Sequence, residues 1–311
     1  MTRANGHRSI TEVGTEMRSY YGRPVVKEPV WKPEIPFYFY TGGLGGASAG
    51  LALMAEARGN PQLARRAWLT ALAGVGASPV LLISDLGRPS RFLNMLRMFK
   101  VTSPMSVGSW ILGAEGGLVA VTAAHEFLGW FPKPVARVAE AVAAALGMPL
   151  ATYTAALIAN TAVPVWHEGR GELPLMFAGG SAMAAGGAAA LRAPSEASPA
   201  RRLAIVGAVT EVAAEEFSKR KLGTLAEPYE TGAAGMFKRA MMTSAAGGTA
   251  LLLVAEARGS RRAGRIGSAL MLASSLLGRW MVFRAGFQSA AAPQYTVEPQ
   301  RARRDTNLGR P

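Results

Sequence analysis

The stretch 82–112 reads LISDLGRPSRFLNMLRMFKVTSPMSVGSWIL, and it places a polar connector between two apolar runs. Gly87 and Pro89 follow the first run, and both residue types commonly end a helix. Ser103 and Pro104 precede the second run, which is the usual pattern of an N-cap followed by proline in the first helical turn. The stretch therefore predicts two helices joined by a short irregular connector.

The connector itself has a helical pattern between residues 90 and 100. Its apolar side chains are spaced to share one helix face, while its arginines lie elsewhere: Phe92, Leu93, Leu96 and Phe99 against Arg91 and Arg97. A short helix with this division is typical of a segment that lies in a membrane interface. We therefore expect both flanking runs to be membrane-spanning.

Long apolar segments recur along the whole chain of 311 residues. A spanning helix needs roughly 20 mostly apolar residues. The candidate segments are 37–57, 67–84, 106–128, 138–161, 173–191, 203–217, 236–257 and 265–287. Segment 203–217 is short and carries Glu211, Glu215 and Glu216, so it is either a buried central helix or one that stops short of the far interface. We expect an all-α integral membrane protein of about eight transmembrane helices in two four-helix bundles.

Composition and charge agree with a membrane protein. Half of the residues are hydrophobic and only 17% are charged, whereas a soluble domain has about 25% charged residues. The net charge of +14 comes from Lys and Arg in the gaps between apolar runs, which argues against a nucleic-acid surface. We divide the chain into an extended polar docking tail (1–35), a transmembrane domain (36–290) and a basic C-terminal tail (291–311).

Cysteine and histidine content limits the redox groups that this chain can hold. The chain has no cysteine, so it cannot bind an iron–sulfur cluster through thiolates. Of its histidines, His7 lies in the polar tail, His125 at the end of the third segment and His167 beyond the fourth. Consecutive helices run antiparallel, so His125 and His167 are expected at opposite faces and cannot share one haem. We expect no metal or redox cofactor on this chain.

Several ionisable residues fall inside apolar segments, where an unpaired charge costs a few kcal/mol. They are Glu115, Glu211, Glu215 and Arg279. Structural pairing, for instance of Arg279 with a glutamate of segment 203–217, is one interpretation, and proton handling or ligand binding is the other. Glu56 and Glu256 lie at segment ends beside Arg58 and Arg258, and we expect interfacial ion pairs there. The glycine-rich stretches 41–50, 178–187 and 244–250 are expected to serve close helix packing.

The stretch 82–112 also resembles the signature of the NrfD-like family, which includes the membrane subunit of polysulfide reductase. The resemblance extends to IPFYFYTGGLGGASAG (35–50) and to LATYTAALIANTAVPVWHEGRGELPLMFAGGSA (150–182), which is similar to the family's YTG, PxW and LPLLF elements. GRWMVFRAGFQSA (278–290) is similar to the family's usual end, although the second half matches less closely.

This resemblance implies a quinone- or quinol-binding membrane subunit of a molybdopterin oxidoreductase-type complex. Such a subunit holds no redox cofactor itself. It exchanges electrons between quinone and a four-cluster ferredoxin-like iron–sulfur subunit, which connects to a molybdopterin catalytic subunit. The resemblance places it as a multi-pass protein of the plasma membrane. A quinone-inactive membrane anchor and a transporter with charges in broken helices are the alternatives.

The site residues implied by the resemblance can be placed one by one. Tyr153 occupies the tyrosine of the YTG element, which is associated with the quinone headgroup, although Ala155 replaces the glycine. Asp85 and Arg88 match the DLGRP element. A histidine that some members carry near the first helix has no counterpart, so Glu115, Asn160 or Asp85 would substitute. The candidates are Asp85 and Glu115 for catalysis, and Tyr153, Asp85, Arg88 and Asn160 for quinone binding.

Two interpretations of Asp85 stay open at this point. As a carboxylate at interfacial depth, it can accept a quinol proton. As a purely structural cap, it would pair with Arg88 at the end of the helix.

Overall fold

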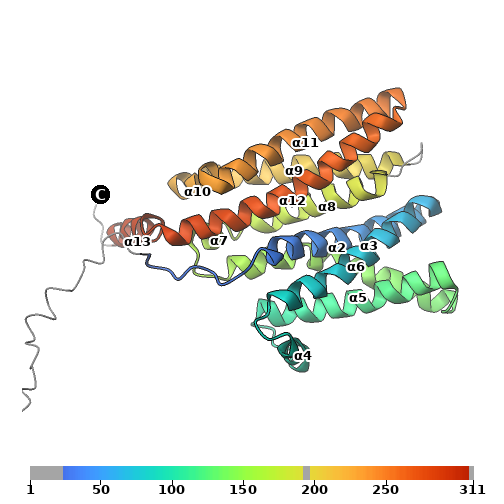
Figure 1. Cartoon of the computed structure of the whole chain (residues 1–311), viewed down its shortest axis with the longest axis horizontal. Helices are drawn as coiled ribbons and strands as arrows, with labels where there is room; N and C mark the ends of the chain where they lie inside the picture. Colours follow the sequence, from blue (N-terminus) through green and yellow to red (C-terminus); the bar gives the residue numbers. More distant parts are fainter. Residues whose placement is uncertain (1–23, 192–196, 308–311) are drawn as a thin grey trace, which may run out of the picture.

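The computed structural model describes residues 24–191 and 197–307 of the chain. Eight long helices lie alongside one another in this part (Figure 1). They are α2 (Glu34–Ala57), α3 (Pro61–Asp85), α5 (Pro104–Leu128), α6 (Lys133–Ala159), α8 (Leu173–Leu191), α9 (Ser198–Leu222), α11 (Gly232–Arg258) and α12 (Arg261–Ala291). Each expected apolar segment corresponds to one of these helices.

Within the described residues, six helices are long and apolar enough to cross a membrane: α3, α5, α6, α8, α11 and α12. Helices α2 and α9 have similar lengths of 24 and 25 residues. Helix α9 is therefore not a short element, and its 25 residues span about 37 Å at 1.5 Å per residue. The chain is an all-α multi-pass membrane protein, as the sequence predicted.

The long helices form two four-helix bundles. In the first bundle, α2 packs on α3 and α6, and α5 packs on the same two helices. The second bundle repeats this arrangement, since α8 and α11 each pack on α9 and α12. Helices α2 and α8 meet at the seam between the bundles (Figure 1). The hairpin α2–α3, which begins the first bundle, is therefore equivalent to the hairpin α8–α9, which begins the second.

Small residues allow the helices to approach closely, as the glycine-rich stretches predicted. A Cβ atom on Gly46 would collide with the backbone of Gly147, where α2 crosses α6. In the second bundle, a Cβ on Gly207 of α9 would collide with the backbone of α8. These contacts replace the large interlocking side chains of soluble cores.

The alternation of the helices defines two ends of the molecule, which we name face A and face B. Face A carries the described N-terminal segment 24–33, the connectors 86–103, 160–172 and 223–231, and the C-terminal segment 292–307. Face B carries the turns 58–60, 129–132 and 259–260. Both described ends of the chain thus lie on the same face.

The face A connectors contain short helices. Helix α4 (Phe92–Arg97) follows a 3₁₀ turn (Pro89–Arg91) and stands away from the bundle (Figure 1). Its residue Leu93 is 72% exposed, which suits a helix in the membrane interface. The oxygen of Ser103 caps α5 by accepting from the Ser106 amide, as predicted.

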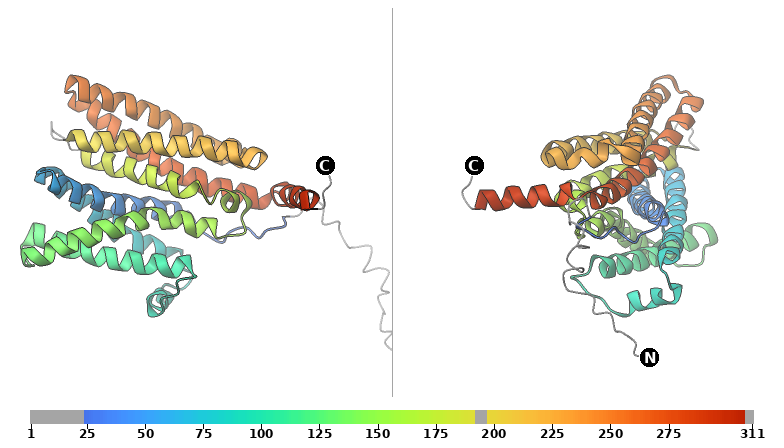
Figure 2. Two further views of the ribbon diagram at one scale, coloured as in Figure 1. Left: turned by 180° about the vertical axis from the view of Figure 1, so that it is seen from behind. Right: turned by 60° about the vertical axis from the view of Figure 1, so that its left-hand side comes forward.

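Further short helices are α7 (Pro164–Glu168) and α10 (Glu227–Glu230), the latter after a 3₁₀ turn (Gly223–Ala226). The segment expected as a basic C-terminal tail contains helix α13 (Gln294–Asn307), which projects away from the bundles (Figure 2).

Candidate functional site

The N-terminal segment is fastened across face A by two contacts. The Trp31 ring stacks on Trp166 of α7, with ring centroids 5.6 Å apart. The backbone N–H of Lys32 donates to Oδ1 of Asp85 over 2.9 Å. Asp85 thus holds the segment that leads into α2. Residues 1–23 of the expected docking tail lie outside the described residues.

Asp85 and Tyr153 line one small pocket at this end of the first bundle. The pocket has a volume of about 40 Å³, and its walls include Trp31, Tyr38 and Ser109. The hydroxyl of Tyr38 is buried without a hydrogen-bond partner in the described structure. The structure therefore brings together two of the residues that the sequence singled out.

Tyr153 owes its position to a glycine. A Cβ atom on Gly108 of α5 would overlap the Tyr153 ring, so only glycine leaves room for the phenol. The ring also lies edge-on to Tyr38, with centroids 6.5 Å apart. Within the described residues, the Tyr153 hydroxyl makes no hydrogen bond, and the side chain is half-buried. It remains available to a ligand.

On its other side, Tyr153 lines a larger opening that we name the face A groove. The groove has a volume of about 580 Å³. Its lining includes Pro104, Val107, Tyr153, Asn160, His167 and Arg170. Tyr153 and Asn160 thus share the groove as predicted sites, whereas Arg88 is exposed and lines neither space.

His167 lines the groove, although sequence analysis did not assign it to the quinone site. Helix α7 is anchored to α12 because the indole N–H of Trp166 donates to the Val282 carbonyl over 2.8 Å. His167 follows directly and lines the groove with Tyr153. The PxW element therefore positions His167. The place of His167 directly after this element is the sequence signal that could have identified it. His125 lies at the other end of the first bundle, so the expected separation of the two histidines is confirmed.

Glu115 lies apart from the groove. It is seven residues beyond Gly108, about two helical turns deeper along α5. Its side chain is fully buried, and neither carboxyl oxygen has a hydrogen-bond partner in the described structure. The structure does not bring Glu115 to Tyr153, and it lines none of the spaces around that residue.

The second bundle holds a connected set of charged groups. Arg279 lies 3.9 Å from Glu211, so the expected pairing with a glutamate of this helix is confirmed. Arg279 also donates to the Phe177 carbonyl over 2.7 Å and to Ser181 over 3.2 Å. Its guanidinium lies 4.0 Å from the centre of the Phe177 ring. These contacts compensate for burying the charge.

The same set of groups continues toward face A. Lys238 lies 2.6 Å from Glu215 and 2.6 Å from Glu230, and Lys219 lies 2.7 Å from Glu230. Burial alone would raise the pKa of Glu230, but the hydrogen bonds from Lys219 and Lys238 outweigh burial and lower it. Glu230 therefore stays charged and links α9, α10 and α11.

The pairs expected at the face B ends are different from those observed. Glu256 pairs with Arg201 at 3.0 Å and Arg202 at 3.5 Å rather than with Arg258. Glu56 instead accepts the indole N–H of Trp68 over 2.9 Å. Neighbours in sequence at a helix end point to different sides of the helix, so partners come from other helices.

Comparison with known proteins assigns the chain. Its residues 24–195 match the family model described as polysulphide reductase, NrfD. The match covers the first bundle and α8, which hold the face A groove. No curated protein matches the sequence. Since the match covers more than half of the chain, this protein belongs to the NrfD family, whose members are membrane subunits of polysulfide reductase-type oxidoreductase complexes.

Proposed function

We propose that this chain is the quinone- or quinol-reactive subunit of its complex and that the face A groove is the quinone site. The observation that carries the proposal is Tyr153, which lines the groove and whose hydroxyl has no hydrogen-bond partner among the described residues. A phenol in an apolar helix is favourable when its O–H has a partner. A quinone carbonyl supplies such a partner.

The groove suits a quinone headgroup in its size and lining. Its volume of about 580 Å³ falls in the usual range for small-molecule sites. Pro104 and Val107 offer apolar walls to the ring, and Asn160 and His167 offer polar groups to its second carbonyl. We assign the role of the missing first-helix histidine to His167 together with Asn160. Quinone itself is the substrate.

In quinol oxidation, the bound molecule loses two electrons and two protons. The electrons pass to an iron–sulfur partner docked on face A, and a molybdopterin subunit carries the terminal reaction. His167, which lines the groove, receives one proton. The second leaves through the Tyr153 hydroxyl that bonds the quinol and passes to Asp85, which shares the small pocket with Tyr153 and releases it to water. Quinone reduction follows the same steps in reverse.

Charge on face A supports the location of the partner. Arg88, Arg91 and Arg97 are exposed on the connector around α4. Arginine side chains there can hold lipid phosphates or acidic groups of the iron–sulfur subunit. The tail before Trp31 would extend this docking surface. We place the complex in the plasma membrane, as for the family.

The test is the variant Tyr153→Phe in the assembled complex. Loss of a hydrogen bond between neutral groups costs about 1 kcal/mol, so the affinity for a quinol analogue should fall roughly fivefold. Assembly should be unchanged, because the ring and its packing against Gly108 remain. Tyr229→Phe, a hydroxyl removed from the second bundle, is the matched control and should bind normally.

Unchanged analogue affinity in Tyr153→Phe would overturn the quinone site. A complex that assembles but binds no quinol analogue even in its native form would instead identify the chain as a quinone-inactive anchor.

A further inference from the structure

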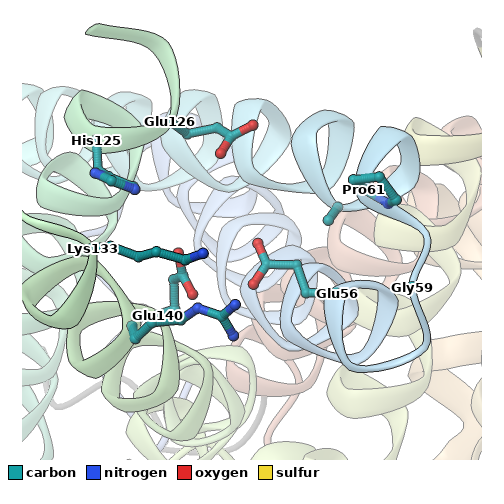
Figure 3. Close-up of a pocket in the computed structure, with 9 residues that line it drawn as sticks. Glu56, Gly59, Pro61, His125, Glu126, Lys133 and Glu140 are labelled. Carbon is teal, nitrogen blue, oxygen red and sulfur yellow. The ribbon is translucent and has the colours of Figure 1, made fainter. Parts of the chain in front are cut away.

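The first bundle has a second polar pocket, at face B and thus at the opposite end from the groove. We name it the face B pocket and define it by Glu56, His125, Glu126, Lys133, Arg137 and Glu140. Its volume is about 480 Å³. Figure 3 shows Glu56, Lys133 and Glu140 pointing into one space, with His125 and Glu126 beside it. The function proposed for face A makes no use of this pocket.

The inner part of the pocket is acidic. Glu140 of α6 is only 6% exposed, and its Oε2 atom has no hydrogen-bond partner in the described structure. Glu56 of α2 faces the same space and uses Oε1 to accept the Trp68 indole N–H. The two carboxyl groups lie within hydrogen-bond reach of each other. Two carboxyl groups this close at a membrane interface favour a cationic hydrogen-bond donor beside them.

The outer part of the pocket is basic. Lys133 and Arg137 are exposed at the start of α6. Neither forms an ion pair in the described part of the chain, although Arg137 is close enough to Glu140 for its charge to act on that carboxyl group. His125 also faces the pocket, and its Nδ1 contacts the Phe131 carbonyl at 2.6 Å. The outer nitrogens are therefore available to an anionic group.

The pocket lies at the depth of lipid headgroups. The adjoining turn exposes Leu128 and Trp130, which are 57% and 73% exposed. Apolar and indole side chains at the ends of spanning helices mark the boundary between acyl chains and headgroups. Zwitterionic lipid headgroups, which carry one cationic and one anionic group, lie at this depth. The membrane can therefore supply a ligand that matches both parts of the pocket.

We propose that the face B pocket binds the headgroup of phosphatidylethanolamine. The primary ammonium donates to Glu140 and Glu56, and the phosphate accepts from Lys133 and Arg137. A choline headgroup lacks N–H donors for the carboxylates. An anionic glycerol headgroup would place no cation against them. The carboxyl groups lie in the inner part of the pocket and the basic side chains in its outer part. This arrangement selects a zwitterionic headgroup with a primary amine.

In the experiment, the purified full chain is placed in nanodiscs of equal parts phosphatidylcholine, phosphatidylethanolamine and phosphatidylglycerol. The protein is then transferred into detergent, and the lipids that stay bound to it are quantified by mass spectrometry. Charge-assisted hydrogen bonds to the ammonium should enrich phosphatidylethanolamine about tenfold over phosphatidylcholine. Glu140→Gln should abolish this enrichment. Glu256→Gln, the matched change at the same face of the second bundle, should retain it.

The double variant Lys133→Ala with Arg137→Ala tests the phosphate contacts at two exposed positions, where we expect substitution to leave the fold intact. It should reduce bound phosphatidylethanolamine about tenfold. Equal retention of the three lipids, or preference for phosphatidylglycerol, would overturn the proposal. Binding of O-phosphoethanolamine by a protein that retains no phosphatidylethanolamine would overturn the lipid source and indicate a soluble ligand. Tyr153→Phe should leave lipid retention unchanged, which separates this inference from the quinone proposal.

Discussion

The two bundles share one arrangement of helices but differ in whether the buried glutamates of their long helices have an ion-pair partner. In the second bundle, Glu211 and Glu215 each have one oxygen in an ion pair, with Arg279 and Lys238. In the first bundle, Glu115 has no partner for either oxygen within the described structure. The first bundle is also open at both ends, with the groove at face A and the charged pocket at face B.

This difference indicates a division of labour. Polar groups that pair with one another stabilise a bundle and are unavailable to ligands. Polar groups without partners cost free energy, so a bundle retains them where water, protons or a ligand will meet them. We therefore infer that the first bundle carries the chemistry and that the second supports it.

The largest effect is expected from breaking the paired set. Arg279→Met removes the partner of a buried glutamate, which typically costs about 3–5 kcal/mol. The variant should show a strongly lowered thermal unfolding midpoint in detergent. Adding Glu211→Met should recover much of the lost stability, because two buried methionines carry no charge that has to be removed from water. Arg239→Met, at an exposed position on α11, is the control. Wild-type stability in the single variant would mean that the second bundle does not depend on this pair.

The next effect concerns Asp85. Asp85 accepts a hydrogen bond from the backbone N–H of Lys32. In Asp85→Asn, the side-chain oxygen of the asparagine can accept the same hydrogen bond. Asn cannot accept a proton at neutral pH, so quinol turnover should fall about a hundredfold while the complex assembles. Turnover at the native rate across neutral pH would make Asp85 a structural tether of the N-terminal segment and leave proton transfer to His167.

A smaller effect is expected from filling the space behind Tyr153. Gly108→Ala places a methyl group where the ring lies, and such overpacking typically costs roughly 1–3 kcal/mol. The ring should shift, and quinol-analogue affinity should fall about tenfold. The same change at Gly116 of α5 meets open space and should have no effect. If both variants bind equally well, the position of Tyr153 does not determine affinity.

Local sequence was sufficient for the helices themselves. Apolar run length, the break at Gly87 and Pro89, and the Ser103 cap depend on residues close together in the chain, and all of these features are present in the structure. Family membership followed from contiguous motifs for the same reason. Helix α9 was underestimated because its charges lower its hydropathy, whereas in the fold Arg279 and Lys238 pair with them.

Tertiary structure alone decided which polar residues meet. Helices rich in Ala and Gly are apolar on most of their surface, so the sequence does not reveal which side of each helix turns inward. Rotation of α5 against α6 placed Gly108 behind Tyr153, and the path of segment 24–33 gave Asp85 its partner in Lys32. The face A groove likewise joins Pro104 and Val107 of α5 to Tyr153 of α6, and the face B pocket joins Glu56 of α2 to Glu140 of α6. Sequence determined the helices and the family because those depend on local composition, and the fold determined the sites because they depend on how the helices are rotated against one another.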